Sequence, residues 1–306
     1  AALVTGALGW IGAHVVRRLV ADGHPVLAVV RPGGDSWRLR GLESMATLID
    51  CDLSDHPRVR QLLADLRPEL VFHCAWYAVP GDYLHSLANL NALSDSLNLA
   101  RVAKESGCHH FLGVGTCVEY DTSPQPLSET SPTGPRSLYA AAKLALHLVL
   151  EQMRGEGMGV TWARLFYLYG PMEDARRLVP SVVRALLAGE PVAISPGQQV
   201  RDFLHVEDVA AALAALGQRH LDGVFNIGSG KPVTVAEVAT TLGRLCGRES
   251  LVRLGARPYS PGDPMYVCAD VTRLSSTGWR PAYNLETGLS DTIRWWRDSG
   301  NSPPTR

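Results

Sequence analysis

Two residues four positions apart, Tyr139 and Lys143, have the types and the spacing for acid–base chemistry. On a helix this spacing places the phenol and the ammonium on one face, one turn apart. A phenol with an ordinary pKa of about 10 exchanges protons poorly at neutral pH, and a nearby cation stabilises its phenolate. We therefore predict that Tyr139 transfers a proton and that Lys143 lowers the pKa of Tyr139.

Thr116 follows an apolar run, Phe111–Val114, that predicts a strand. Its hydroxyl can bind the oxygen of a carbonyl group while Tyr139 supplies or removes the proton and a nicotinamide exchanges hydride with the carbon. A hydroxyl that only caps a helix or a turn is the alternative. We favour the catalytic role because the order of the predicted strands brings Thr116 toward Tyr139.

Three glycines lie in the segment Gly6-Ala-Leu-Gly-Trp-Ile-Gly12, between a predicted strand and a predicted helix. Glycines at this spacing allow a tight turn and let a pyrophosphate approach the N-terminus of the helix. Glycines that serve only the turn are the alternative. The strand before them and the helix after them favour a dinucleotide site.

Arg31 follows the second predicted strand, nineteen residues beyond Gly12, where a chain that binds NAD would place Asp or Glu. A guanidinium there suits a 2′-phosphate, so we favour NADP(H) over NAD(H). In the alternative, Arg31 is solvated and Asp35 reaches the ribose. Asp52, at the end of the third strand, either binds the adenine amino group or caps the next helix.

Short apolar runs alternate with amphipathic stretches in the first half of the chain, which is the pattern of β-α-β units and a parallel sheet. The predicted strands are Ala2–Thr5, Val26–Val30, Thr47–Ile49, Leu70–Cys74, Phe111–Val114 and Val160–Arg164. The predicted helices are Ile11–Asp22, Arg58–Leu66, Tyr83–Ser106 and Leu138–Arg154. Right-handed crossovers then give an α/β fold, a Rossmann-type doubly wound sheet with its ligand at the carboxyl ends of the strands.

Beyond Gly170-Pro171 the elements become shorter and proline more frequent, with helices predicted near Leu178–Leu187, Val235–Cys246 and Leu285–Arg297. The segment Val206–Ile227, a helix and then an apolar strand, is expected to return to the large sheet. We therefore predict two domains. Residues 1–165 plus about 203–227 form a dinucleotide-binding Rossmann domain, and residues 166–202 plus about 228–306 form a smaller C-terminal α/β lobe that binds substrate.

Composition excludes several classes of protein. The chain has 306 residues, of which 46% are hydrophobic and 19% charged, as in ordinary globular proteins. Its net charge of −1 leaves no cationic surplus for nucleic acid or anionic lipid. Its six cysteines form no C-x-x-C pair and have no histidine at metal-ligand spacing, which predicts reduced thiols in the cytoplasm and no metal. No apolar run reaches the length of a membrane span.

The motifs together resemble those of the extended short-chain dehydrogenase/reductases, specifically the nucleotide-sugar epimerase, dehydratase and reductase group. They are Gly6-x-x-Gly9-x-x-Gly12, Asp52-Leu53, His73-Cys-Ala75, Thr116 with Tyr120, Tyr139-x-x-x-Lys143, Arg164 with Tyr169-Gly-Pro171, Arg201-Asp-Phe-Leu-His-Val-Glu-Asp208, Asn226-Ile-Gly-Ser-Gly230 and Pro261-Gly-Asp263. The resemblance covers nearly the whole chain. It implies a nucleoside diphosphate sugar as substrate, and a homodimer formed through the helices around 83–106 and 138–154.

The resemblance, together with the residues at and beside its motifs, gives the expected site residues. The catalytic set is Thr116, Tyr139 and Lys143. The expected cofactor-binding residues are Gly6, Gly9, Trp10, Ile11, Gly12, Arg31, Asp52, Leu53, Ala75, Tyr139 and Lys143. The expected substrate-binding residues are Trp76, Cys117, Tyr167, Arg201 and Arg257, with Arg201 facing the diphosphate.

Departures from the family pattern narrow the predicted reaction. Dehydratases of the group carry Asp-Glu directly after the catalytic threonine, whereas this chain has Cys117 and Val118. Val118 cannot move a proton, which disfavours 4,6-dehydration. Arg31 points to NADPH, the cofactor that cells use to drive reduction. We therefore predict an NADPH-dependent ketoreductase that acts on the C4 keto group of a nucleoside diphosphate 4-keto-deoxyhexose.

Two further departures concern the substrate. Tyr167 replaces an asparagine that touches the sugar nucleotide in several relatives, and Ser260 stands where a second phosphate-binding arginine is common. Arg257, Arg176 or Arg177 would have to compensate. The alternatives are an epimerase, with Cys117 as an acid or base in one version, an NADPH-dependent reductase of a non-sugar carbonyl compound, and a non-catalytic NADP-sensing relative. We expect His73, His205 and Trp295-Trp296 to serve packing.

Overall fold

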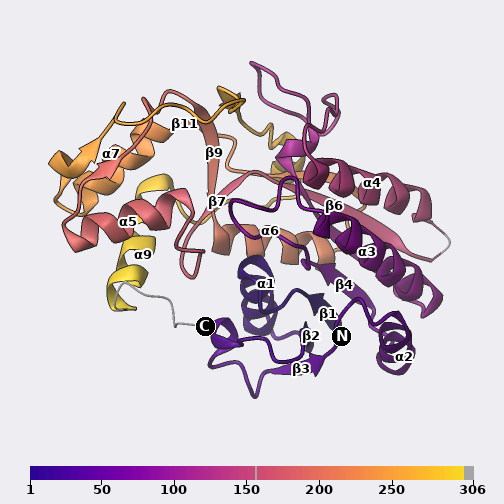
Figure 1. Ribbon diagram of the computed structural model, residues 1–306. Coiled ribbons are helices and arrows are strands. Elements are labelled where there is room, and N and C mark those ends of the chain that lie inside the picture. The colour runs from indigo at the N-terminus through magenta and orange to yellow at the C-terminus, as the bar shows by residue number, and fades with distance from the viewer. Residues whose placement is uncertain (156, 300–306) are drawn as a thin grey trace. The chain divides into compact units, whose positions relative to one another are not determined.

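The computed structural model describes residues 1–155 and 157–299. The chain divides into two compact units (Figure 1). Unit 1 comprises Ala1–Asp121, Pro132–Leu165 and Ala210–Phe225, and unit 2 comprises Thr122–Ser131, Phe166–Val209 and Asn226–Arg306. Residues 122–131, 203–209 and 226–227 thus fall in unit 2, whereas the sequence predicted them in the first domain, and the assignment of domain roles stays a prediction.

Unit 1 is built on a seven-stranded sheet. Its strands are β1 (Ala2–Thr5), β2 (Val26–Val30), β3 (Ala46–Asp50), β4 (Leu70–His73), β5 (His110–Thr116), β6 (Gly159–Leu165) and β10 (Gly223–Ile227). Their order is β10-β6-β5-β4-β1-β2-β3, and the pairs from β3 to β6 are parallel. Strand order therefore reverses between β1 and β4, as in a doubly wound Rossmann sheet, and the predicted fold class is confirmed. The strand after Val206 returns to this sheet beside β6, as expected.

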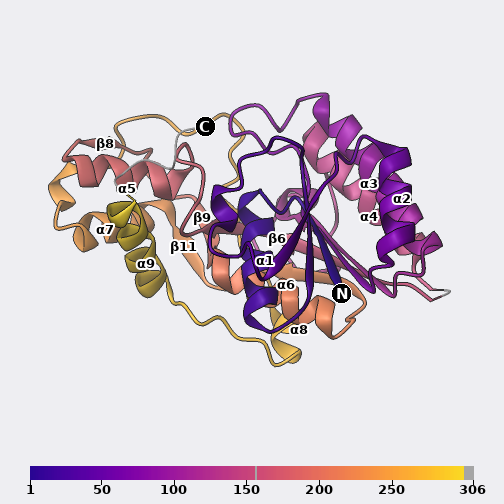
Figure 2. The same ribbon diagram turned by 90° about the horizontal axis from the view of Figure 1, so that it is seen from below.

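Helices cover both faces of this sheet. They are α1 (Trp10–Ala21), α2 (His56–Leu66), α3 (Ala88–Glu105), α4 (Leu138–Met153) and α6 (Val206–Gln218), with short 3₁₀ turns η1 (Trp37–Leu39) and η2 (Cys117–Glu119). Figure 2 shows α2, α3 and α4 together on one side of the sheet. Hydrogen bonds to side chains begin two of them, because Asp55 accepts from the Arg58 N–H and Ser137 accepts from the Ala140 N–H.

Helix α3 begins five residues later than the sequence predicts. The Asn89 amide donates to the carbonyl oxygens of Tyr83, at 2.6 Å, and Ser86, at 2.9 Å. These bonds fix the preceding segment as turns, so the helical pattern there is overridden by a local side-chain contact. The remaining helices and strands of unit 1 agree with the predicted ones to within one or two residues at most ends.

The core of unit 1 packs Trp162 of β6 against β5 and α4. A Cβ atom on Gly113 would lie 2.6 Å from the Trp162 ring, and one on Gly115 would overlap the Trp162 indole nitrogen. The two strand glycines therefore make room for this indole beside Thr116. His73 is fully buried and hydrogen-bonded to Thr5 and Ser96, which is the packing role expected from the sequence.

Unit 2 contains a four-stranded sheet around β9 (Val200–His205), joined by β7 (Tyr167–Tyr169), β11 (Pro232–Thr234) and β13 (Tyr266–Val267), and a two-stranded pair, β8 (Val192–Ala193) with β12 (Val252–Arg253). Its helices are α5 (Leu178–Ala188), α7 (Val235–Leu245), α8 (Thr272–Ser276) and α9 (Leu285–Asp298), with the turn η3 (Glu249–Leu251). The apolar faces of α5, α7 and α9 enclose Trp296, which is fully buried, so this tryptophan belongs to the core as predicted.

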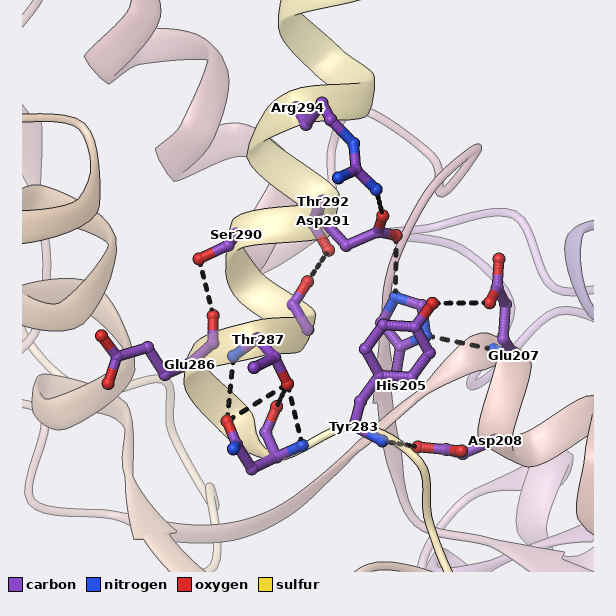
Figure 3. Close-up of polar contacts among 12 residues, drawn as sticks. His205, Glu207, Asp208, Tyr283, Glu286, Thr287, Ser290, Asp291, Thr292 and Arg294 are labelled. Atoms are coloured by element: carbon purple, nitrogen blue, oxygen red, sulfur yellow. Dashed lines mark hydrogen bonds and ion pairs between the residues drawn. The ribbon is translucent and has the colours of Figure 1, made fainter.

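The end of β9 is tied to α9 by polar contacts (Figure 3). The His205 ring packs on Tyr283 with centroids 4.0 Å apart, and its Nε2 lies 3.4 Å from Asp291. Burial lowers the pKa of His205 to about 4, so the imidazole is neutral at pH 7. The Tyr283 hydroxyl donates to Glu207 at 2.8 Å, and the Asp208 carboxylate accepts from the Tyr283 N–H. His205 therefore serves packing, as the sequence predicted.

Candidate functional site

The glycine loop between β1 and α1 leaves no room for side chains. Gly6 has φ of +67°, and a Cβ atom there would lie 2.6 Å from the Ala75 nitrogen. A Cβ atom on Gly12 would overlap the Gly6 carbonyl. Gly9 begins α1 without a side-chain cap, so no side chain covers the first N–H groups of the helix there. The loop therefore fits the close approach of a pyrophosphate that the sequence predicted.

Arg31 and Asp52 lie side by side at the carboxyl ends of β2 and β3. The Arg31 side chain is 82% exposed, and its Nε lies 3.8 Å from the Asp52 carboxylate. Asp52 accepts from the backbone N–H and the hydroxyl of Ser54, and these hydrogen bonds lower the pKa of Asp52. Asp35, the alternative ribose ligand, accepts from the Trp37 N–H at 3.0 Å and so caps a local turn.

A second arginine beside the glycine loop was not predicted. The Arg38 guanidinium lies 4.4 Å from the centre of the Trp37 ring and donates to the Leu8 carbonyl at 3.3 Å. Arg17 of α1 donates to the Arg38 carbonyl at 2.6 Å, which holds η1 on the helix. Only the fold brings Arg38 to Leu8, thirty residues earlier in the chain, so spacing alone gave no signal for it.

Thr116 ends β5 and begins η2. Its backbone N–H donates to the Glu119 carboxylate at 2.8 Å, and its hydroxyl accepts from the Val118 N–H at 3.4 Å. The same hydroxyl hydrogen-bonds the phenol of Tyr139. The structure therefore brings Thr116 and Tyr139 together and gives Thr116 the capping role, while its catalytic role stays a prediction.

Tyr139 lies in the first turn of α4, between two other aromatic rings. Its ring meets Tyr83 edge-on at 4.9 Å and Trp76 edge-on at 6.4 Å between centroids. Burial raises the pKa of Tyr139, the neighbouring Tyr83 and Glu119 raise it further, and the hydrogen bond with Thr116 lowers it. The predicted net lowering of the Tyr139 pKa is wrong for the free protein, because burial dominates.

Lys143 is almost completely buried one turn along α4. Its ammonium donates to the Val114 carbonyl at 2.6 Å and lies 3.8 Å from the centre of the Trp76 ring. Burial lowers the pKa of Lys143 to about 7, while the electrostatic effects of Glu119 and Cys74 raise it. The lysine therefore changes charge close to neutral pH. Trp76, predicted to touch substrate, here covers this ammonium and donates to Asn89 at 2.9 Å.

Glu119 was missed by the sequence analysis. It is fully buried and accepts from Thr116, from the Trp162 indole at 3.0 Å and from Arg164 at 2.8 Å. The neighbouring Cys117 is buried, and Val118 is 37% exposed. The acid closest in sequence to Thr116 is thus held by protein donors.

The remaining substrate-binding candidates, Tyr167, Arg201 and Arg257, lie in unit 2. Arg201 is 3% exposed and donates to the Asp263 carboxylate at 2.5 Å, with its guanidinium 5.0 Å from the centre of the Tyr167 ring. A carboxylate therefore already balances the arginine predicted to meet the diphosphate. Arg257 is exposed in the loop after β12.

Other findings bear on what the chain contains. All six cysteines are free thiols. Among residues 1–155 and 157–299, no three His, Cys, Asp or Glu side chains are grouped to hold a metal ion. No helix in the same ranges has the length and apolar character needed to cross a bilayer.

Comparison with known proteins places this geometry among sugar-nucleotide enzymes. Residues 2–228 match the family model for the NAD dependent epimerase/dehydratase family. The chain is 30% identical to the UDP-glucose 4-epimerase of Mycolicibacterium smegmatis, covering 97% of this chain and 98% of that protein. The crystal structure of a UDP-glucose 4-epimerase from Thermotoga maritima with UDP-glucose has a TM-score of 0.85 at 28% identity, covering 97% and 99%. MoeE5 in complex with UDP-glucose and NAD has a TM-score of 0.83 at 30% identity, with the same coverage.

Proposed function

We propose that this chain, which belongs to the NAD-dependent epimerase/dehydratase family of nucleotide-sugar enzymes, is an NADPH-dependent ketoreductase. Its substrate would be a nucleoside diphosphate 4-keto-deoxyhexose, reduced at C4. The observation that carries this proposal is the attachment of α4 to the carboxyl end of β5, where Lys143 donates to the Val114 carbonyl at 2.6 Å and Tyr139 lies beside Thr116. A threonine and tyrosine pair of this kind binds and protonates a carbonyl oxygen.

The chemistry needs one hydride and one proton. NADPH, when bound, supplies the hydride to the carbonyl carbon. Thr116 donates a hydrogen bond to the carbonyl oxygen, and Tyr139 gives that oxygen its proton as the alcohol forms. The raised pKa of Tyr139 keeps the phenol protonated in the free enzyme, so the proton is in place before reduction. The charged form of Lys143, one turn along α4, would stabilise the phenolate that forms as this proton is transferred.

Reduction without further steps is favoured by the residues that follow Thr116. Val118 carries no acid or base, and the Cys117 thiol is buried. Glu119 accepts hydrogen bonds from three protein groups, so it is not placed to remove a proton from a sugar. Dehydration needs such groups in addition to Tyr139.

The preference for NADPH rests on two cations. Arg31 is exposed at the end of β2, where the ribose of a dinucleotide lies in Rossmann folds, and Arg38 lies beside the glycine loop. Guanidinium groups pair with phosphate through charge-assisted hydrogen bonds. The residue that directly follows β2 is Arg31 and not an acid. Asp35, four residues further on, accepts a hydrogen bond from the Trp37 N–H.

Substrate contacts are proposed for Trp76 and Cys117 of unit 1 and for Tyr167, Arg201 and Arg257 of unit 2. Arg201 meets a diphosphate only if its pairing with Asp263 loosens or if the phosphate joins the pair from another side. Arg176, one of the residues that would compensate for Ser260, already donates twice to Asp174.

We propose that α3 and α4 form a homodimer interface. Leu87 is 73% exposed just before α3, and Leu90 is half exposed on its first turn. Leu148 and Val149 are exposed on α4. Exposed apolar side chains on packed neighbouring helices are typical of a surface buried by a second copy. Sedimentation of the wild type and of Leu148→Asp checks it: the wild type sediments as a dimer and the variant as a monomer.

The reductase is tested by incubating the pure protein with NADPH and the dTDP or UDP form of a 4-keto-6-deoxyhexose. Stoichiometric loss of NADPH absorbance with formation of the 4-alcohol is expected. Absence of NADPH consumption with both sugar nucleotides would refute the proposal. Tyr139→Phe is the matched control, because it keeps the ring and removes only the hydroxyl.

A UDP-sugar 4-epimerase is the second candidate, favoured by 30% identity over nearly the full length of one such enzyme. It would use NAD(H) in substoichiometric amounts to oxidise and re-reduce the same carbon. Conversion of UDP-glucose to UDP-galactose without added NADPH would establish it. If UDP-glucose is not converted and NADPH is consumed with a ketosugar, the epimerase is excluded and the reductase stands.

A further inference from the structure

Glu119 is a buried carboxylate that touches the backbone of Thr116. One of its oxygens accepts from the Thr116 N–H at 2.8 Å, and the other accepts from Arg164 at 2.8 Å and from the Trp162 indole at 3.0 Å. These partners are all donors. A proton on Glu119 would therefore replace one of these bonds, so the contacts hold the group as a carboxylate, although burial raises its pKa.

Glu119 and Lys143 meet the same side of one strand. Lys143 donates to the carbonyl of Val114, and Glu119 accepts from the N–H of Thr116, two residues further along β5. Backbone groups two residues apart in a strand point the same way, and the carbonyl of one residue and the N–H two residues on are closer than the roughly 6.6 Å that separates like groups. The ammonium and the carboxylate thus lie at neighbouring backbone positions at the carboxyl end of β5.

Other titratable groups face this pair from the surrounding elements. On the Lys143 side, burial lowers the pKa of His73 to about 3 and raises that of Cys74 to about 12, so both are neutral at pH 7. On the Glu119 side, His147 of α4 lies 3.5 Å from Arg164, and burial lowers its pKa to about 4.

Arg164 is the cation on the Glu119 side and partly offsets the carboxylate. Its guanidinium lies over the Tyr120 ring, 4.4 Å from the centre, and is almost fully buried. The phenols of Tyr139 and Tyr83 and the thiol of Cys117 complete the set of titratable neighbours, and each is uncharged in its protonated form. Glu119 is thus the ionised acid that acts on Lys143.

We propose that Glu119 is a positioning residue for the reacting groups. Its carboxylate fixes the peptide of Thr116, and its buried negative charge holds the protons on Lys143 and Tyr139. Both electrostatic effects have the same sign, since the charge of Glu119 raises the pKa of each residue. The proposal rests on the proposed roles of Thr116, Tyr139 and Lys143.

The test is a titration that needs no substrate. The chain has three lysines, Lys104, Lys143 and Lys231. Labelling lysine with ¹³C at Cε gives three resonances, and the one lost in Lys143→Met is assigned to Lys143. Its midpoint is measured in the wild type, in Glu119→Gln and in Trp162→Phe. The last is the matched control, because it removes the indole N–H that donates to both oxygens of Glu119 without replacing a charged residue.

The wild-type midpoint is expected near pH 7. Glu119→Gln is expected to lower it by about half a pH unit or more, and Trp162→Phe to leave it unchanged. With a working substrate, Glu119→Gln is also expected to lower kcat about tenfold and to move the alkaline limb of the pH profile by the same amount. An unchanged Lys143 midpoint in Glu119→Gln overturns the proposal.

A second variant and a readout that needs no substrate keep the test decisive. If Glu119→Gln does not fold, Glu119→Asp keeps the charge but shortens the reach to Thr116, so it should retain the wild-type midpoint and lose kcat. A midpoint that falls in Glu119→Asp, or an unchanged kcat, overturns the proposal. If the wild type reduces no ketosugar, the reductase function fails, while the NMR titration still decides the role of Glu119.

Discussion

Replacing Arg31 by alanine tests the preference for NADPH. The side chain is 82% exposed, so solvent screens any phosphate that it meets. Two unit charges at 4 Å interact by about 1 kcal/mol in water and about 4 kcal/mol near a protein surface, and the exposure of Arg31 places it toward the lower value. A phosphate with nearly two negative charges then gives about 1–2 kcal/mol, or a loss of roughly 5- to 30-fold in NADPH affinity.

Asp52 adds to this effect. In the wild type Arg31 lies 3.8 Å from its carboxylate and balances it. After Arg31→Ala, Asp52 faces the phosphate without that cation, so the variant loses an attraction and gains a repulsion. NADH has no 2′-phosphate, and its affinity is expected to change by less than about twofold.

The assay is a fluorescence titration with NADPH and with NADH at low and at high salt. The NADPH loss is expected to shrink at high salt, because the interaction is exposed. Arg38→Ala, measured alone and with Arg31→Ala, separates the two cations. An NADPH to NADH affinity ratio that stays the same in Arg31→Ala would refute the assignment of Arg31 and reopen Asp35 as the ribose ligand.

Three further predictions follow from the site. Tyr139→Phe should lower kcat at least about a hundredfold while NADPH affinity changes little, and a variant with wild-type turnover would exclude Tyr139 as the proton donor. The kcat/KM of the free enzyme should fall as pH rises through about 7, because Lys143 then loses the charge that would stabilise the Tyr139 phenolate; a profile flat from pH 6 to about 9 would contradict this role of Lys143. Gly115→Ala should destabilise the protein by about 1–3 kcal/mol, because its Cβ would overlap the Trp162 indole and lie 2.6 Å from Glu119; an unchanged denaturant midpoint would show that the strand yields without cost.

Local patterns were enough to predict the fold of unit 1. The strands are short apolar runs, and Gly12 is required by its contact with Gly6 within the same β1–α1 turn. Gly6 is required by its positive φ and by Ala75, which follows β4. Parallel strands joined by helices leave few alternatives to a doubly wound sheet. The start of α3 could not be predicted in this way, because the Asn89 side chain selects turns where the pattern is helical.

The candidate site was predicted in part. The order of the predicted strands placed Thr116 near Tyr139, and the structure brings the two residues together. The role of Glu119 depends on Trp162 and Arg164, 43 and 45 residues away, so no local spacing reveals it. The pKa of Tyr139 was predicted with the wrong sign, because helical spacing to Lys143 says nothing about how deeply the phenol is enclosed or which group the ammonium contacts.

The most direct test of the central claim follows a single hydrogen atom. The protein is incubated with a nucleoside diphosphate 4-keto-6-deoxyhexose and NADPH that carries deuterium at the transferred position of the nicotinamide. The product is then examined by NMR. Deuterium at C4 of a newly formed alcohol, in one-to-one ratio with oxidised NADPH, is the predicted result. Solvent deuterium in the sugar with NADPH unchanged, or no reaction of the ketosugar at all, would contradict the account.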